Sequence, residues 1–215
     1  DDMSTKIPGI FVGGEASCIS IHGANRLGGN SLTDAVVTGR LAGMGATNYA
    51  KDATFGKGEK TKQLAKMWQD KFKEIANGSG EVHEMYALRE ELGKQNWDNM
   101  GIFRTQAQLD ALSAALEDIE ARYKNIRIPD NSSVMNTAFT DYVELGNLIL
   151  LSRCACLAAQ NRHESRGAHT REDYPKRDDV NFLKHSIVNL KDGKLELSYK
   201  PVVVTEFSLD GRKPQ

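Results

Sequence analysis

Two charged residues near the start of the chain are set among glycines, where they could contact a bound ligand. Glu15 follows Gly13-Gly14, and Arg26 precedes Gly28-Gly29. Glycines allow a backbone to approach a ligand closely, and a carboxylate at the end of a strand suits a hydrogen bond to the hydroxyls of a ribose. The guanidinium of Arg26 offers a planar pair of donors that fits a carboxylate and that lysine cannot copy. A Gly-rich turn with a surface arginine is an open alternative.

The segment from His22 to Leu32 leads directly into a predicted helix. Its glycines, amide side chains and single arginine come just before the helix start, where free N–H groups favour a negative charge. The pyrimidine edge of a reduced flavin carries such a charge. The sequence has neither a G-x-G-x-x-G fingerprint nor a GK[ST] phosphate loop. If the chain binds a dinucleotide, we therefore expect the main phosphate-binding loop to lie outside it.

The composition is that of a globular protein with a real core. The chain has 215 residues, of which 40% are hydrophobic and 27% charged, and its net charge is −1. One large domain or two small ones are expected, and the charge balance argues against nucleic acid as a partner. The longest apolar run, Leu145 to Leu151, is too short to span a bilayer. The N-terminal residues lack the basic and apolar regions of a signal peptide.

Three cysteines, Cys18, Cys154 and Cys156, do not suggest a disulfide framework in a chain of this size. Cys154 and Cys156 could be combined with His163 and His169 as metal ligands. Residues two apart on a helix point to different faces, however. We therefore interpret these cysteines as small apolar packing residues and expect no metal site.

The fold class expected is α+β and mainly α. A buried strand at Ile10 to Val12 precedes a helix from Leu32 to Tyr49, for which Ser31 and Asp34 resemble a capping box. The apolar and small residues of this helix recur at the spacing of one buried face: Leu32, Ala35, Val36, Gly39, Ala42, Gly43 and Ala46. Gly39 and Gly43 would weaken an isolated helix, so we expect close packing there.

A polar break at Ala53 to Lys60 is the clearest domain boundary, and the sequence beyond it is strongly helical. Four helices are expected in an antiparallel bundle with short turns: 62–76, 82–93, 105–122 and 139–160. The last part, from Lys184 to Val204, alternates like strands around a hairpin turn at Lys191 to Lys194, and Pro201 limits the following strand to an edge or a strand start. We therefore divide the chain into 1–52, 53–163 and 164–215.

Three motifs together resemble the flavoprotein subunits of succinate dehydrogenase and fumarate reductase. The first is Gly14-Glu15-Ala16-Ser17-Cys18 with the segment from His22 to Leu32, which is similar to the second FAD-binding segment of that family. The second is Met100-Gly101-Ile102-Phe103-Arg104. The third runs from Glu164 to Asp179 and includes Glu164-Ser165-Arg166-Gly167-Ala168-His169. They occur in the family's order and cover nearly the whole chain.

The resemblance implies roles for the matching positions. Arg26 would bind a carboxylate of succinate or fumarate, and Glu15 would bind the ribose of FAD. Asn30, Ser31 and Leu32 would contact the flavin. The family's catalytic residues, the histidine that holds flavin covalently and the Gly-rich FAD fingerprint belong to earlier segments. We therefore expect no catalytic residue here.

The other polar residues of the motifs are interpreted as supporting groups. His22 lies next to the expected site but is read as structural. His163 and His169 are expected to be hydrogen-bonded or at an interface. Arg166 and Arg171 are expected to pair with the acidic residues around them: Glu164, Glu172, Asp173, Asp178 and Asp179. That network would tie the C-terminal segment to the flavin domain or to an iron–sulfur partner.

By analogy, the intact enzyme would move a hydride between FAD and a dicarboxylate carbon. Its partners would be an iron–sulfur subunit and a membrane anchor subunit with quinone, and it would lie peripherally on the bacterial inner membrane, on the cytoplasmic or the periplasmic face. The alternatives are a soluble flavoenzyme of the L-aspartate oxidase type and a non-catalytic helical docking module. The docking reading gives no reason for Arg26 among glycines.

Overall fold

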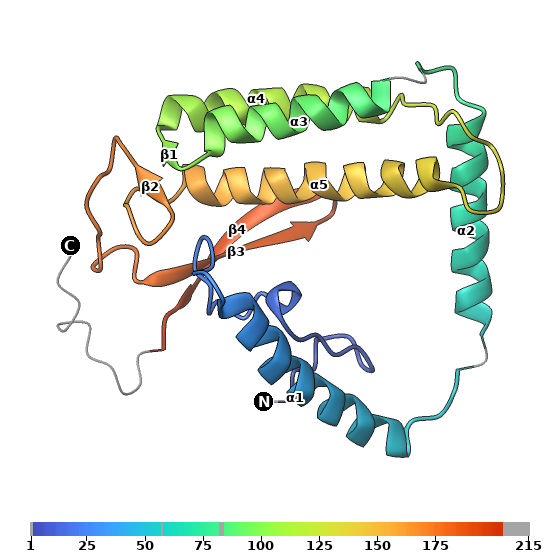
Figure 1. Ribbon diagram of the computed structural model, residues 1–215, viewed down its shortest axis with the longest axis horizontal. Helices are drawn as coiled ribbons and strands as arrows, with labels where there is room; N and C mark the ends of the chain where they lie inside the picture. The colour runs from blue at the N-terminus through green and yellow to red at the C-terminus, as the bar shows by residue number, and fades with distance from the viewer. Residues whose placement is uncertain (1, 57, 82–83, 204–215) are drawn as a thin grey trace. The chain divides into compact units, whose positions relative to one another are not determined.

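The computed structural model describes residues 2–56, 58–81 and 84–203, which form two compact units (Figure 1). The first unit ends at Lys71 and the second begins at Phe72, so the division falls within helix α2 (Glu59–Ala76). The expected division at 52/53 and 163/164 remains a proposal about the complete protein.

Helix α1 (Asn30–Asp52) dominates the first unit and confirms the helix predicted there, although it begins two residues early. The residue before it is Gly29, in the left-handed conformation with φ of 84°, and no side chain caps the helix. The predicted capping box of Ser31 and Asp34 is therefore wrong. Ser31 already lies inside the helix, and Asp34 bonds to the side chains of His22 and Thr38 instead.

The buried row of α1 differs from the predicted one and consists of Asp34, Thr38, Ala42 and Gly45. Only Ala42 belongs to both sets, and Leu32 is 75% exposed. The helical spacing was predicted correctly, but the wrong face was chosen. The segments that precede α1 pack on the face that carries the polar residues Asp34 and Thr38. A Cβ at Gly45 would collide with the carbonyl of Asp2, whereas Gly39 and Gly43 have open space at that position.

The predicted buried strand at Ile10 to Val12 is wrong. Phe11 forms one isolated antiparallel bridge with Ser4, and Ile10 is exposed. The segment turns back on itself, since the N–H of Val12 donates to the carbonyl of Met3. With no further strand beside it among the described residues, the ladder does not extend.

The second unit is a bundle of α3 (Glu84–Met100), α4 (Gln106–Tyr123) and α5 (Thr137–Gln160). These helices confirm three of the four predicted ones, except that α3 continues beyond Gly93 and that the predicted start at Val82 lies outside the described residues. The fourth, predicted at 62–76, is α2, of which only the last turn packs in the core of the bundle. Consecutive helices reverse direction, as Figure 1 shows. Their facing sides form one hydrophobic core, whose most buried members include Met85, Leu88, Leu112, Leu116, Ile119 and Leu145. The last turn of α2 contributes Phe72 and Ile75.

Side chains set where two of these helices begin. Thr105 accepts a hydrogen bond from the N–H of Gln108 at 3.3 Å, and Asn136 accepts one from the N–H of Phe139 at 2.9 Å. Both are N-cap residues of favoured types, because their side-chain oxygens satisfy N–H groups that the helix leaves without a partner.

Helix α5 is long and apolar enough, by length and composition, to cross a membrane. No membrane span was expected from the sequence, because the run Leu145 to Leu151 was considered and not the whole helix. In the fold, Leu145, Ile149 and Cys156 of this helix lie in the hydrophobic core. Burial in this core accounts for part of its apolar composition, since 28% of the apolar window is buried and Leu151 is exposed.

Two small sheets complete the second unit. Strands β1 (Phe103–Arg104) and β2 (Thr170–Arg171) pair in parallel, a contact that the sequence did not predict. Strands β3 (Lys184–Lys191) and β4 (Lys194–Pro201) form the predicted hairpin, with Asp192 and Gly193 in the left-handed turn conformation. Strand β4 ends at Pro201, and Val204 lies outside the described residues. The fold class predicted, mainly α with small β elements, is confirmed.

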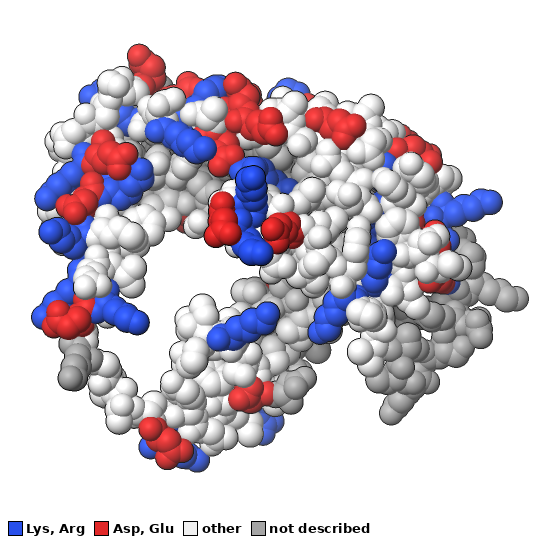
Figure 2. Space-filling model, turned by 180° about the vertical axis from the view of Figure 1, so that it is seen from behind, with Lys and Arg blue, Asp and Glu red and all other residues white. Residues whose placement is uncertain are grey.

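Figure 2 shows one face of the protein, on which positive and negative side chains are interspersed. Several are paired across the helices of the bundle. Arg122 of α4 contacts three carboxylates, those of Glu84, Glu91 and Asp118. Such exposed pairs add little stability, so the apolar core must hold the bundle together.

The core of the bundle predicts a large effect of truncation at its centre. Leu145→Ala should lower the free energy of unfolding by about 2–5 kcal/mol, because Leu145 is fully buried and the change leaves a cavity. Leu151→Ala, on an exposed position of the same helix, is the matched control. Urea unfolding followed by circular dichroism would measure both. Equal losses in the two variants would contradict the packing described.

Candidate functional site

The structure brings the two charged candidates, Glu15 and Arg26, together. The Nε atom of Arg26 lies 3.6 Å from Oε1 of Glu15, and their side chains are 39% and 60% exposed. Glu15 begins the short 3-10 helix η1 (Glu15–Ser17). The guanidinium therefore lies on the surface of the first unit, within reach of a ligand that also contacts Glu15.

A close backbone approach holds the Glu15 loop on α1. The N–H of Gly14 donates to the hydroxyl of Thr38 at 2.6 Å. A Cβ at Gly13 would come within 2.6 to 2.7 Å of backbone atoms of Thr38 and Gly39. Only glycine fits at position 13. The close packing of this loop on α1 therefore requires Gly13, whether or not a ligand binds nearby.

The loop that carries Arg26 is held by a histidine and a buried carboxylate. Nε2 of His22 lies 2.9 Å from Oδ2 of Asp34, whose residue is only 4% exposed. Thr38 also donates toward Asp34, with its hydroxyl 2.9 Å from Oδ1 and 2.7 Å from the carbonyl. His22 is thus a supporting residue, as the sequence predicted. Asp34 and Thr38 were missed because the pattern placed them outside the expected buried face.

The start of α1 presents N–H groups that no side chain caps. Asn30 and Leu32 are exposed, and Ser31 is half-buried. Nearby, a cavity of about 270 Å³ opens at this end of the helix, with both apolar and polar lining residues: Ile21, His22, Asn30, Thr33, Asp34, Val37 and Thr38. An anionic or electron-rich group placed at the helix start would be stabilised by the helix dipole.

These features fit a flavin nucleotide. Glu15 of η1 and Asn30 and Leu32 of the first turn of α1 are exposed. Gly23, Gly28 and Gly29 stand where a Cβ would meet nothing within 4 Å, so the backbone there is accessible to a planar ring.

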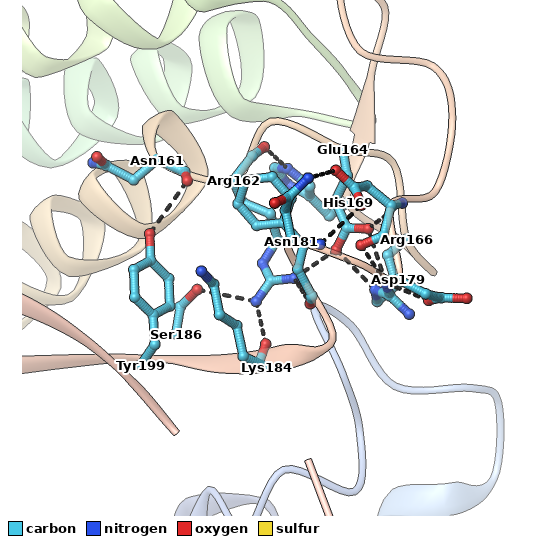
Figure 3. Close-up of polar contacts among 12 residues, drawn as sticks. Asn161, Arg162, Glu164, Arg166, His169, Asp179, Asn181, Lys184, Ser186 and Tyr199 are labelled. Atoms are coloured by element: carbon cyan, nitrogen blue, oxygen red, sulfur yellow. Dashed lines mark hydrogen bonds and ion pairs between the residues drawn. The ribbon is translucent and has the colours of Figure 1, made fainter. Parts of the chain in front are cut away.

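In the second unit the charged C-terminal motif forms a buried network around Glu164 (Figure 3). Glu164 is 0% exposed, and its carboxylate accepts hydrogen bonds from Arg162 at 2.6 Å and from Arg166 at 2.8 and 2.9 Å. The N–H of Asp178 adds a further bond at 2.8 Å. Arg166 also binds Asp179. Pairing with Glu164 raises the pKa of Arg166, so this guanidinium stays charged.

Arg171 is fully buried and joins the helices to the C-terminal segment. It binds Asp173 through two donors and donates to the carbonyl of Ala159 and to Gln106. The Arg171 guanidinium holds the pKa of Asp173 far below its ordinary value. The predicted pairing of Arg166 and Arg171 with Glu164, Asp173 and Asp179 is confirmed.

Two other acids of the motif behave differently from the prediction. The carboxylate of Asp178 accepts hydrogen bonds from Val180 and Asn181, not from an arginine. Glu172 contributes its backbone N–H, which donates to the carbonyl of Arg104. In both cases the local turn or strand geometry supplies the partner.

His169 links two of the sequence motifs. Nη1 of Arg104 lies 3.0 Å from Nδ1, and Nε2 lies 3.0 Å from the carbonyl of Arg162. Because the guanidinium can only donate, Nδ1 must accept and Nε2 must carry the proton. Burial, together with the neighbouring arginines, lowers the pKa of His169. His169 is hydrogen-bonded as predicted, and His163 stacks on Tyr174 at a centroid distance of 4.8 Å.

The cysteines lie in ordinary packing environments. Cys156 is buried in the core, where its Sγ lies 3.3 Å from the carbonyl of Leu109, and burial raises its pKa to about 11. Cys154 is half-buried and Cys18 is exposed. Within residues 2–56, 58–81 and 84–203, no group of three His, Cys, Asp or Glu side chains could hold a metal.

Comparison with known proteins identifies relatives along the whole chain. Residues 89–214 match the family model described as "Fumarate reductase flavoprotein C-term". The chain is 58% identical over 214 residues to the 8-methylmenaquinol:fumarate reductase flavoprotein subunit of Wolinella succinogenes, covering 99% of this chain and 35% of that protein. It is 37% identical over 206 residues to the succinate dehydrogenase flavoprotein subunit of Rickettsia conorii, covering 95% of this chain and 34% of that protein.

A solved structure described as quinol-fumarate reductase with menaquinol molecules has the same fold. It is 38% identical, with a TM-score of 0.87, over 96% of this chain and 36% of that one. The chain therefore spans about a third of the length of the relatives it matches.

The environment of His169 predicts a pH-dependent stability. The unfolded state takes up a proton near the ordinary pKa of 6.5, whereas the folded state resists it, so stability should decline as the pH falls through 6.5. His169→Gln should flatten this decline while losing stability at neutral pH. His163→Gln is the control and should keep the slope. Urea unfolding from about pH 8 to pH 5 would test this, and an unchanged slope in His169→Gln would contradict it.

Proposed function

Since the chain belongs to the C-terminal part of the succinate dehydrogenase and fumarate reductase flavoprotein family, we propose that it completes the FAD and dicarboxylate site of an enzyme that interconverts succinate and fumarate. The observation that carries this proposal is the position of Arg26. Its guanidinium is exposed beside Glu15 and belongs to a glycine-rich loop that leads to the uncapped start of α1.

Arg26 would bind and orient the substrate. Succinate and fumarate are four-carbon dianions, and a guanidinium can hold one carboxylate with two parallel hydrogen bonds. The side chain makes one long contact, at 3.6 Å from Glu15, and so keeps donors available. The role is electrostatic positioning, because an arginine does not give up its proton at neutral pH. The groups that transfer protons would come from the rest of the subunit.

Glu15, Asn30, Ser31 and Leu32 would hold FAD. The carboxylate of Glu15 suits the ribose hydroxyls, and the N–H groups of Ser31 and Leu32 suit the pyrimidine edge of the flavin. Bound FAD would supply hydride transfer to or from the dicarboxylate. The residues of this chain would fix its orientation and add positive potential where charge develops on the ring.

The partners proposed are an iron–sulfur subunit and a membrane anchor subunit that reacts with quinone. They would receive or deliver the electrons, and the flavoprotein would lie peripherally on the bacterial inner membrane, on its cytoplasmic face. The similarity to a solved structure described as quinol-fumarate reductase with menaquinol molecules supports this proposal.

Substitution of Arg26 in the full-length subunit tests the proposal. Arg26→Ala should lower kcat/KM for fumarate by about 10²–10³-fold, because the carboxylate loses its charged partner, while FAD stays bound. Arg26→Lys should recover only part of the loss. Arg40→Ala, which removes an exposed arginine of α1, is the control. Steady-state kinetics and flavin absorbance would measure both properties. Full activity in Arg26→Ala would favour a docking module.

The 215-residue chain alone should bind FAD weakly or not at all and should not reduce dyes with succinate. The reason is that the phosphate-binding fingerprint is absent from it. Absorbance of the purified chain near the flavin band, with and without added FAD, would measure this. A tightly bound yellow flavin, or succinate-dependent dye reduction, would contradict the prediction.

A further inference from the structure

The carboxylate of Asp34 is the common anchor of both loops of the proposed site. Asp34 and Thr38 are the buried polar residues of the first unit among those described, and their side chains contact one another. One arm from Asp34 reaches His22 at 2.9 Å. The other passes through Thr38 to the N–H of Gly14 at 2.6 Å.

Each arm ends beside one of the proposed ligand-binding residues. His22 opens the loop that leads to Arg26, and Gly14 directly precedes Glu15. Among the described residues, the polar contact between the two loops is the one between the exposed side chains of Arg26 and Glu15, at 3.6 Å. The bonds of the buried Asp34 therefore restrict the distance between Arg26 and Glu15, which their exposed side chains alone would not fix.

The His22 arm has no substitute. The other ring nitrogen, Nδ1, is buried and has no hydrogen-bond partner in the part of the chain that the structure describes. The bond to Asp34 is thus the polar interaction that fixes the ring. Without it, a buried imidazole would keep no hydrogen bond, which disfavours the observed ring position.

Burying a carboxylate at this position of the helix costs free energy. The row that holds Asp34 continues with Ala42 and Gly45, so an apolar side chain would be the usual occupant. Burial of a charge is tolerated only when donors surround it. Here the donors are His22 and the hydroxyl of Thr38, whose single hydrogen lies between Oδ1 and the carbonyl oxygen of Asp34, and each donor belongs to one of the two arms.

We propose that Asp34 is the positioning residue of the site, which sets the distance between the substrate-binding Arg26 and the FAD-binding Glu15 by holding their loops on α1. This inference rests on the proposed function. It goes further by assigning separate effects to the arms: the His22 arm governs dicarboxylate binding, and the Thr38 arm governs FAD binding.

The test uses the full-length subunit in its complex, with FAD content and malonate affinity as readouts. Malonate is a dicarboxylate that cannot be oxidised to fumarate, and its Kd is obtained from the change it causes in the flavin spectrum. His22→Phe should raise that Kd and the KM for fumarate by roughly tenfold, with FAD content and kcat retained, because a displaced clamp weakens binding. Thr38→Val should weaken FAD binding by a similar factor, with the malonate Kd of the FAD-saturated protein unchanged.

Asp34→Asn should show both effects, and Asp34→Glu should restore part of each. Asp52→Asn, the same change at an exposed position of the same helix, is the matched control. A melting temperature equal to that of the control would exclude general unfolding. If Asp34→Asn does not fold, the separate effects of His22→Phe on malonate binding and of Thr38→Val on FAD binding decide the question by themselves.

A failure of the inference about Asp34 can be distinguished from a failure of the proposed function. If the unsubstituted subunit binds FAD and malonate and depends on Arg26, but the variants of both arms bind both ligands within twofold of it, the inference about Asp34 is wrong and the proposed function stands. The inference is also wrong if both arms change both ligands equally. If the unsubstituted subunit binds neither ligand, the proposed function itself fails.

Discussion

A buried charge must be surrounded by donors or by opposite charge, and this constraint shapes both units of the protein. In the first unit, His22 and Thr38 surround the carboxylate of Asp34. In the second, two arginines and a backbone N–H surround Glu164. Removing one partner from either set would leave an uncompensated buried charge, which is far more costly than losing an exposed pair.

In the second unit the same constraint joins segments that are far apart in the sequence. Arg171 is buried because Asp173, Gln106 and the carbonyl of Ala159 all lie within its reach. The short pairing of β1 with β2 places Arg104 beside His169. Two of the motifs that resemble the family are therefore neighbours in space, and their polar residues serve the packing of one structural unit.

The sequence predicted the bundle well because its helices bury leucines and isoleucines at helical spacing. In the predicted helix 105–122, Leu109, Leu112, Leu116 and Ile119 recur at helical spacing, and all four are buried. The hairpin followed from its turn residues in the same way. In both cases the signal lies in residues close together in the chain.

The first unit was predicted less well, for a physical reason. Hydrogen bonds from Gly14 and His22 to Thr38 and Asp34 determine which face of α1 is buried. The hydrophobic pattern of the helix itself cannot predict such contacts. Arg26 and Glu15 were found because a charged residue among glycines is conspicuous. Asp34 was interpreted as a helix cap, since its burial depends on the fold rather than on its neighbours in sequence.

The apolar character of α5 has a consequence for synthesis of the protein. A segment with this hydropathy resembles a membrane span while it is still unfolded. Helices α3 and α4 precede α5 in the chain, so they emerge from the ribosome before α5 does. Their apolar faces can pack against the side of α5 that carries Leu145, Ile149 and Cys156 as soon as it emerges, which shortens the time during which this side is exposed to water.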